Sequence, residues 1–302
     1  MKQLKTLTAF PAVSGNEDAL ANWLKLSLRP IAKKVLIDKV GNVLATRGKP
    51  KITLVAHMDK VGYMISQING KKILAVPLKK AKAIPPKGKK WSVIILGKVA
   101  VEAKLTSTNS GLKVEVDDKK SQLIKVGDLV TLSPNFSVKN KQIISQGLDN
   151  CLGILAALKT FEKAKNICLI FTVQEEIGQL GARVATGSIN SDAIIVLDTT
   201  YDEGNIKMGK GPALCLKDDI IFDKRLVNKL IETAKFKKIP YQLEVLESGG
   251  SDARAVREID GTIPVVMVGI PIKNMHSPEE VSDLSDVIMT IKLLIKFIGK
   301  YV

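Results

Sequence analysis

Two adjacent carboxylates, Glu175 and Glu176, follow shortly after the apolar run 167–171 and have the clearest capacity for chemistry. An apolar run of this length predicts a buried strand, so both side chains are expected at the exit of that strand. Consecutive residues of an extended segment point to opposite sides, and the two carboxylates are therefore not expected to share one task. One could bind a metal ion while the other transfers protons; a solvated pair of charges at a strand end is the alternative.

The two histidines of the chain, His57 and His276, also follow apolar runs, and Asp198 comes directly after a third one. In open α/β sheets, ligands bind beyond the carboxyl ends of the strands, so these residues are expected at one rim of a sheet. A solitary histidine at a strand end is usually structural. Two histidines accompanied by several carboxylates in matching positions instead indicate a shared metal site.

Imidazole and carboxylate ligands without cysteine thiolate suit Zn²⁺, Co²⁺ or Mn²⁺ in a catalytic site that keeps one position open for water. Two histidines and three carboxylates are enough for two ions if one carboxylate bridges them. Two neighbouring ions would lower the pKa of a shared water, and one further carboxylate would have to remain free to accept its proton. The pattern therefore predicts a catalytic metal site.

The elements expected to position these side chains alternate between apolar strands and amphipathic helices, which is typical of an α/β domain. Asp149 precedes a segment with helical spacing and is expected near the start of that helix. Ser14 and Glu17 have the spacing of a capping box, which predicts a helix that stops at Pro30. Strands are expected at 35–37, 52–56, 167–171, 193–197, 241–246 and 264–270, and helices at 154–161, 178–186, 226–234 and 284–298.

Residues 67–145 differ from the rest of the chain because short β-rich pieces are separated there by Gly, Pro, Asn and lysine clusters. No long helical period occurs in this segment, which predicts an all-β module inserted into the α/β domain. The expected domains are 1–66 together with 146–302, and the inserted segment 67–145. The densest basic stretch, 79–90, contains two prolines and a glycine and predicts a solvated loop.

At 302 residues and 45% hydrophobic content, the chain can bury a full core. No apolar stretch approaches the roughly 20 residues that span a bilayer, so a cytoplasmic protein without membrane contact is expected. The three cysteines show no CxxC spacing, which predicts reduced thiols. The net charge of +16 would attract nucleic acid or acidic peptides, but aromatic content is only 4% and no nucleic-acid-binding motif occurs, so nucleic acid is not the expected partner.

Five short motifs occur along nearly the whole chain: Ala56–Asp59, Gly147–Asn150, Gln174–Gly178, Leu197–Thr200 and Met275–Pro278. In sequence and order they resemble the M42 metalloaminopeptidases, which include glutamyl and deblocking aminopeptidases. The resemblance implies a zinc-peptidase domain with a mixed sheet and helices on both faces, interrupted by a small β-barrel dimerisation domain. It also implies removal of N-terminal residues from short peptides with a free N-terminus, by a homo-oligomer that is a dimer or a dodecamer.

Residue by residue, the resemblance implies two divalent ions per subunit, Zn²⁺ or Co²⁺. The five implied ligands are His57 and Asp198 on one ion, Glu176 and His276 on the other, and Asp149 as the bridge between them. Glu175 would be the general base. Asp59 would orient the His57 ring from behind, which fixes its tautomer.

The implied substrate contacts are less complete. Asp252 resembles a family position near the pocket, to which we give a supporting role, and Lys273 is expected to contact substrate. Lys60 and Lys273 are lysines at positions where the family usually has other residues, and they suggest a preference for acidic N-terminal residues. Two other functions remain open: a glycosidase of the endoglucanase type that uses paired carboxylates, and a non-enzymatic binder of anions or nucleic acid on the same scaffold.

Overall fold

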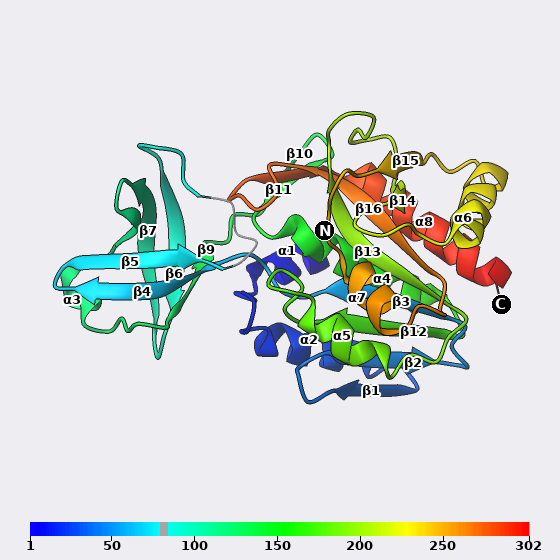
Figure 1. Ribbon diagram of the computed structural model, residues 1–302, viewed down its shortest axis with the longest axis horizontal. Helices are drawn as coiled ribbons and strands as arrows, with labels where there is room; N and C mark the ends of the chain where they lie inside the picture. The colour runs from blue at the N-terminus through cyan, green and yellow to red at the C-terminus, as the bar shows by residue number, and fades with distance from the viewer. Residues whose placement is uncertain (79–83, 302) are drawn as a thin grey trace.

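A computed structural model describes residues 1–78 and 84–301 and consists of an α/β body with a smaller β-barrel that projects from it (Figure 1). The body contains a mixed sheet and most of the helices, and the barrel is formed by strands that lie between residues 63 and 132. This arrangement confirms the predicted α/β fold with an inserted all-β barrel.

The strands of the large sheet are β1 (Lys34–Ile37), β2 (Val43–Arg47), β3 (Ile52–His57), β10 (Ser137–Lys139), β11 (Gln142–Ser145), β12 (Ile167–Thr172), β13 (Ala193–Tyr201), β14 (Ala213–Lys217), β15 (Gln242–Val245), β16 (Val265–Lys273) and β17 (Glu280–Asp283). Their order is β1-β2-β12-β3-β13-β16-β17-β11-β10, and β14 and β15 extend the sheet from β16. The four central strands β12, β3, β13 and β16 are parallel. Their carboxyl ends therefore meet at one rim, where chemically active side chains can gather.

The helices are α1 (Lys2–Ala9), α2 (Asp18–Leu28), α3 (Asp118–Ser121), α4 (Leu148–Lys163), α5 (Leu180–Thr186), α6 (Lys224–Phe236), α7 (Asp252–Ile259) and α8 (Leu284–Tyr301). One group packs around α4, which contacts α1, α8 and strands β3 and β13. In a second group α5 packs against α7, and both contact strands of the sheet. The sheet is thus covered on both faces, which explains why its central strands are apolar along their whole length.

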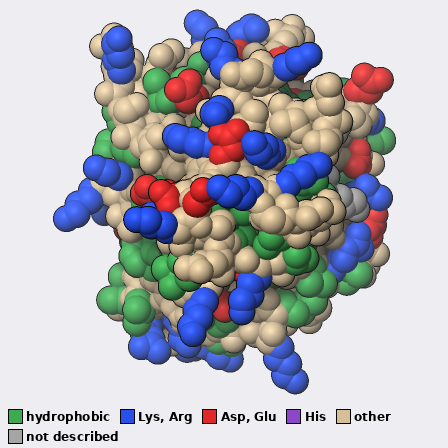
Figure 2. Space-filling view, turned by 90° about the vertical axis from the view of Figure 1, so that its left-hand side faces the viewer, with side chains coloured by type: hydrophobic (Ala, Val, Ile, Leu, Met, Phe, Trp, Pro, Cys, Tyr) green, Lys and Arg blue, Asp and Glu red, His purple; other side chains and the backbone are tan. Residues whose placement is uncertain are grey.

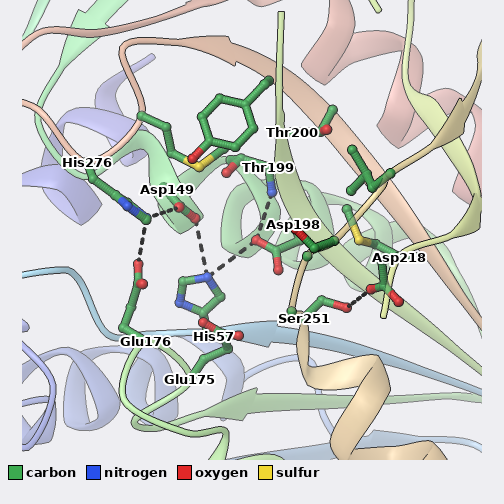
Figure 3. Close-up of a pocket in the computed structure, with 17 residues that line it drawn as sticks. His57, Asp149, Glu175, Glu176, Asp198, Thr199, Thr200, Asp218, Ser251 and His276 are labelled. Atoms are coloured by element: carbon green, nitrogen blue, oxygen red, sulfur yellow. Dashed lines mark hydrogen bonds and ion pairs between the residues drawn. The ribbon is translucent and has the colours of Figure 1, made fainter. Parts of the chain in front are cut away.

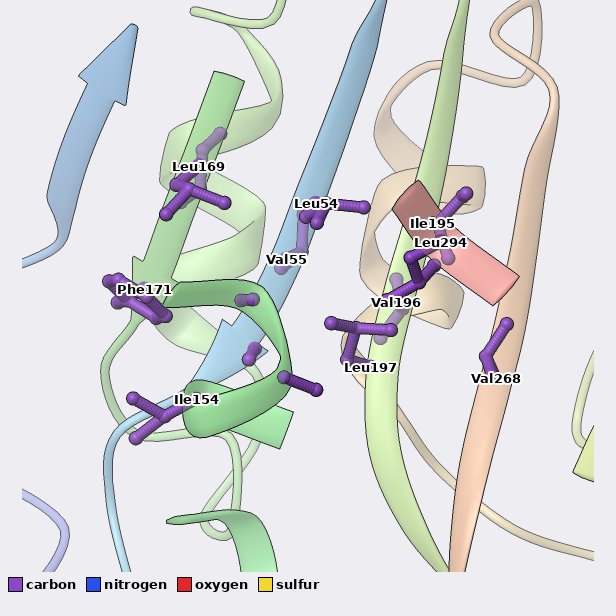
Figure 4. Packing of buried hydrophobic residues seen from close by; sticks show 14 of the residues in the cluster. Leu54, Val55, Ile154, Leu169, Phe171, Ile195, Val196, Leu197, Val268 and Leu294 are labelled. Atoms are coloured by element: carbon purple, nitrogen blue, oxygen red, sulfur yellow. The ribbon is translucent and has the colours of Figure 1, made fainter. Parts of the chain in front are cut away.

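The core of the body is formed by side chains from these parallel strands and from the helices that cover them (Figure 4). Leu54 and Val55 of β3 lie beside Val196 of β13, and Leu294 of α8 is also buried in this cluster. Full burial of one such aliphatic side chain contributes about 1.5–3 kcal/mol. The rim is therefore built on the buried core of the body.

The barrel strands are β4 (Tyr63–Asn69), β5 (Lys72–Pro77), β6 (Lys90–Leu96), β7 (Ala100–Thr108), β8 (Gly111–Glu115) and β9 (Leu129–Leu132). They close in the order β4-β5-β8-β7-β6-β9 around a separate hydrophobic core. The segment 67–145 contains five of these six strands, whereas β4 begins at Tyr63 and β10 and β11 pair within the large sheet. The division into functional domains stays a prediction.

The predicted capping box at the start of α2 is wrong, because the structure uses its residues elsewhere. Glu17 is the N-cap residue of α2 but makes no side-chain capping hydrogen bond. The Ser14 hydroxyl donates to Asp59, and the Glu17 carboxylate accepts the backbone N–H of Gln174. Both side chains therefore connect the N-terminal segment to the rim.

Other expectations concern the surface and the cysteines. The face at the barrel end has lysine and arginine side chains spread over it, with acidic and apolar ones between them (Figure 2). Of the basic stretch 79–90, residues 79–83 lie outside the described part, 84–89 form no helix or strand, and Lys90 begins β6.

All three cysteines are free thiols. Within residues 1–78 and 84–301, no helix combines the length and apolarity required to span a membrane.

Candidate metal centre

Six of the predicted site residues line one cavity of about 650 Å³ at the carboxyl ends of the central strands (Figure 3). They come from five positions in the fold: the end of β3, the first turn of α4, the loop after β12, which carries two of them, the strand β13 and the loop after β16. The six residues are His57, Asp149, Glu175, Glu176, Asp198 and His276. Residues far apart in the sequence are thus brought to the rim as expected from the strand pattern.

Asp149 lies between the two imidazoles. Its Oδ1 is 3.3 Å from Nε2 of His57, and its Oδ2 is 3.1 Å from Nε2 of His276. Each imidazole nitrogen has a second carboxylate beside it: Asp198 Oδ1 at 3.3 Å from His57, and Glu176 Oε1 at 3.3 Å from His276. Two three-residue groups of possible metal ligands therefore share Asp149.

The donors in these groups fit divalent metal ions. They are imidazole nitrogens and carboxylate oxygens, which suit Zn²⁺, Co²⁺ or Mn²⁺. Asp149 Oδ1 and Glu176 Oε1 are buried, and apart from the 3.3 Å contacts with the imidazole nitrogens they have no hydrogen-bond partner among the described residues. Buried acceptors without a donor are costly, and a cation between the carboxylates would remove that cost.

The histidines show how strongly this cluster favours positive charge. Burial lowers the pKa of His57, but Asp198 and Asp149 outweigh that effect and raise its pKa well above the usual value. Burial likewise opposes protonation of His276, yet Asp149 and Glu176 raise its pKa to about 12. Metal ions would supply the positive charge in place of these protons, because ligand imidazoles bind metal in the neutral form.

Asp59 holds the segment that carries the two adjacent glutamates. Its Oδ1 accepts the backbone N–H of Glu175 at 2.9 Å, and its Oδ2 accepts that of Glu176 at 3.1 Å. The Ser14 hydroxyl donates to the same Oδ2 at 2.6 Å. On the side of His57, Nδ1 lies 3.1 Å from the Asp59 backbone carbonyl oxygen and 3.5 Å from its carboxylate. A proton on Nδ1 would satisfy that carbonyl and leave Nε2 free for a metal.

Glu175 lines the cavity and is 3% exposed. Gln179 Nε2 lies 3.4 Å from its Oε1 and donates to the backbone carbonyl of Ser251 at 2.7 Å. The glutamine therefore links this carboxylate to the loop that precedes α7. Glu175 belongs to neither of the two groups that share Asp149, but it forms a third group of possible ligands with His57 and Glu176.

Asp252 and the two lysines do not line the cavity. Asp252 is buried at the start of α7, where it accepts a hydrogen bond from the Thr172 hydroxyl, and burial raises its pKa to about 7. Lys273 is 54% exposed at the side chain and forms an ion pair with Asp202 at 3.2 Å.

Lys60 is 2% exposed, and its ammonium donates to the backbone carbonyls of Thr8 and Phe10 at 2.9 and 2.8 Å. The ammonium is directed at the end of α1 and not at the cavity, so Lys60 gives no support to the expected preference for acidic substrates, which stays a prediction.

Sequence reasoning missed Glu280, which is 1% exposed. Its Oε2 accepts the backbone N–H of Asp149 at 3.2 Å, and its Oε1 accepts that of His276 at 2.7 Å. The neighbouring Glu279 is exposed, and no spacing or composition signal separates the two glutamates. Only the pairing of β17 with β16, which turns Glu280 inward, distinguishes them.

Comparison with known proteins agrees with this geometry. Residues 106–293 match the sequence profile of the M42 glutamyl aminopeptidases. A putative aminopeptidase of Acetivibrio thermocellus is 32% identical over 320 residues, which cover 98% of this chain and 97% of that protein.

Solved structures show the same fold. An aminopeptidase of the archaeon Desulfurococcus kamchatkensis superposes with a TM-score of 0.89 at 25% identity, covering 98% of this chain and 93% of the other. The TET1 peptidase of Pyrococcus horikoshii, described as assembling into a tetrahedron or a large octahedral shell, superposes with a TM-score of 0.84 at 23% identity and 98% coverage of both chains.

Proposed function

The chain belongs to the M42 glutamyl aminopeptidase family, and we propose that it removes N-terminal residues from short peptides with two divalent ions per subunit. Membership confirms the resemblance seen in the five sequence motifs and makes the protein a metal-dependent peptide hydrolase. The observation that carries the two-ion proposal is the position of Asp149, whose two oxygens each lie beside a different imidazole.

The proposed ligands follow from the two groups around Asp149. One ion, Zn²⁺ or Co²⁺, would be held by His57 and Asp198, a second by Glu176 and His276, and Asp149 would bridge them. Ions bound there would lower the pKa of a water molecule and polarise the scissile carbonyl.

Within this proposal, the protein's own side chains orient the reactants and move the proton. Glu175 accepts the proton of the attacking water and passes it to the departing amine. Glu175 directly precedes the proposed ligand Glu176 in the sequence. The backbone N–H groups of both glutamates donate to Asp59, which fixes the two residues relative to each other. The high burial of Glu175 keeps bulk water away from the proton that it carries.

The two alternative functions are not favoured. A glycosidase with paired carboxylates does not require histidines, whereas both histidines of this chain lie within 3.3 Å of two carboxylates each. A binder of anions or nucleic acid would place cations at its site. Among the described residues that line the cavity, two aspartates and two glutamates surround the histidines. None of these lining residues is a lysine or an arginine.

The expected preference for acidic N-terminal residues does not enter this proposal. It depended on two lysines, and one of them is buried against α1 while the other pairs with Asp202 on the surface. We retain a supporting role for Asp252 behind the cavity wall.

We also propose that the chain forms homo-oligomers through the barrel of segment 67–145. The barrel stands apart from the body in Figure 1, and several apolar side chains are exposed on it. These are Val76, Val99, Leu123 and Val126. Assembly into closed shells is described for the structurally similar TET1 peptidase. Light scattering of the protein as it elutes from a gel-filtration column would measure the mass of the particle. A monomer at all protein concentrations would contradict this proposal.

The experiment that tests the proposed function combines hydrolysis with metal analysis. Aminoacyl p-nitroanilides should be hydrolysed after Zn²⁺ or Co²⁺ is added, and a chelator should abolish that activity. The same substrates with a blocked amino group should not be cleaved. Inductively coupled plasma mass spectrometry should find two metal ions per chain. A protein that binds no metal ion, or that hydrolyses no aminoacyl substrate, would overturn the proposal.

A further inference from the structure

The cavity has two chemically different sides (Figure 3). Glu175 and the proposed ion ligands lie on one side, and Thr200, Asp218 and Ser251 lie on the other. If the proposed function holds, the amino group and scissile bond of a peptide lie at the ion ligands. The side chain of the N-terminal residue then faces the second side, whose chemistry would select it.

Asp218 is the charged residue of that second side. It lines the cavity although only 1% of the residue is exposed. One carboxylate oxygen accepts the backbone N–H of Ile220 at 2.8 Å, and the other accepts the Ser251 hydroxyl at 3.2 Å. These contacts fix the carboxylate, and each oxygen keeps the capacity for a further hydrogen bond.

A second buried carboxylate, Glu244, lies behind Thr200. Thr200 lines the cavity, and its hydroxyl donates to Oε1 of Glu244. Glu244 is 3% exposed. Oε2 of Glu244 is buried and has no hydrogen-bond partner among the described residues. The Cys215 thiol, a weak donor, also interacts with this carboxylate, so Glu244 has no strong donor besides the Thr200 hydroxyl among the described residues.

No cation of the described chain compensates these two carboxylates. Neither carboxylate forms an ion pair with a described lysine or arginine. No described lysine or arginine lines the cavity. Lys217, adjacent in sequence, donates instead to the backbone carbonyls of Asp218 and Leu246. Burial raises the pKa of both Asp218 and Glu244, which reflects the cost of negative charge without a counter-ion.

We propose that this side of the cavity binds the cationic side chain of an N-terminal lysine or arginine, with Asp218 as the specificity-determining acceptor. Glu244 lies behind Thr200 and does not line the cavity, so it would contribute negative charge without direct contact. An ammonium brings three donors and a guanidinium five, and both oxygens of Asp218 keep the capacity to accept from them. Two apolar residues of the lining, Leu246 and Met267, would contact the methylene stem. The preference is therefore the opposite of the one expected from the sequence.

The test compares lysyl, arginyl, norleucyl and glutamyl p-nitroanilides with the metal-loaded protein. Norleucine has the stem of lysine without its charge, so the ratio of kcat/KM values isolates the ammonium. We expect lysyl or arginyl substrate to exceed norleucyl substrate by roughly 10- to 100-fold, the range for a hydrogen bond to a charged group. In Asp218→Asn the ratio should fall toward one.

Asp219→Asn is the matched control, because it removes the same charge from a neighbouring side chain that pairs with Arg254 outside the cavity. This variant should keep the lysyl to norleucyl ratio. Faster cleavage of norleucyl or glutamyl substrate than of both cationic ones would overturn the inference, while the aminopeptidase function would stand.

If no aminoacyl substrate is hydrolysed, the proposed function fails and calorimetry decides the inference separately. Lysine amide should then bind more tightly than norleucine amide, and the difference should disappear in Asp218→Asn. Equal affinities of the two amides would overturn it.

Discussion

Glu280 holds Asp149 through its backbone: the buried carboxylate accepts the Asp149 N–H at 3.2 Å. Its second oxygen accepts the N–H of His276 at 2.7 Å, so one side chain connects two proposed ligands that are 127 residues apart. His276 has a positive φ of 65°, a conformation that few residues other than glycine adopt. The hydrogen bond from its N–H stabilises the backbone at that point.

Glu280→Gln should therefore weaken metal binding although Glu280 is not a proposed ligand. An amide can present only one oxygen, so one of the two backbone N–H groups would face a donor. Loss of such an orienting contact typically lowers metal affinity by about 10- to 100-fold, and competition with a fluorescent chelator would measure it. Glu279→Gln is the control, since Glu279 is exposed, and equal affinity of the two variants would contradict the role of Glu280.

Glu175→Gln should separate catalysis from metal binding. The change removes the proton acceptor but none of the proposed ligands, so turnover should fall about 10²- to 10⁴-fold. Metal content, measured by plasma mass spectrometry, should stay at the wild-type value. Loss of ions from this variant would show that Glu175 acts as a ligand.

The sequence was sufficient to place the rim, because each strand that leads to it is a continuous apolar run. His57 ends β3 and Asp198 lies within β13, and the parallel pairing of these strands puts both side chains at one edge. The inserted all-β module could likewise be predicted, since residues 67–145 lack helical periodicity.

What the sequence could not supply was the partner of each buried polar group. Ser14 and Glu17 satisfy the spacing of a capping box, yet their side chains contact Asp59 and Gln174, which lie far away in sequence. Asp218 gave no signal either, because it is an acidic residue next to another one, and only the fold turns it into the cavity. Long-range hydrogen bonds override local propensity in these cases.

Asp149→Ala should remove more metal than Asp198→Ala. Asp149 belongs to two of the three groups of possible ligands, one around each imidazole, whereas Asp198 belongs to one. We therefore expect the first variant to lose both ions and the second to retain one, as measured by ion content after gel filtration. Equal ion content in the two variants would contradict the bridging position of Asp149.

Lys60→Met should destabilise the fold, because the ammonium of this buried lysine donates to the carbonyls of Thr8 and Phe10. Methionine fills a similar volume but leaves these acceptors without a donor, at a cost of about 1–3 kcal/mol in the free energy of unfolding. Lys5→Met, at an exposed position of α1, should have little effect.

Burial lowers the pKa of Lys60 below its usual 10.5, so between the folded and the unfolded pKa the unfolded chain carries a proton on this lysine that the folded chain has lost. The contribution of this group to stability should consequently increase as the pH rises through that interval, and the increase should be absent in Lys60→Met. Chemical denaturation of both proteins across this pH range would measure the difference, and parallel pH profiles would show that Lys60 is not charged differently in the folded state.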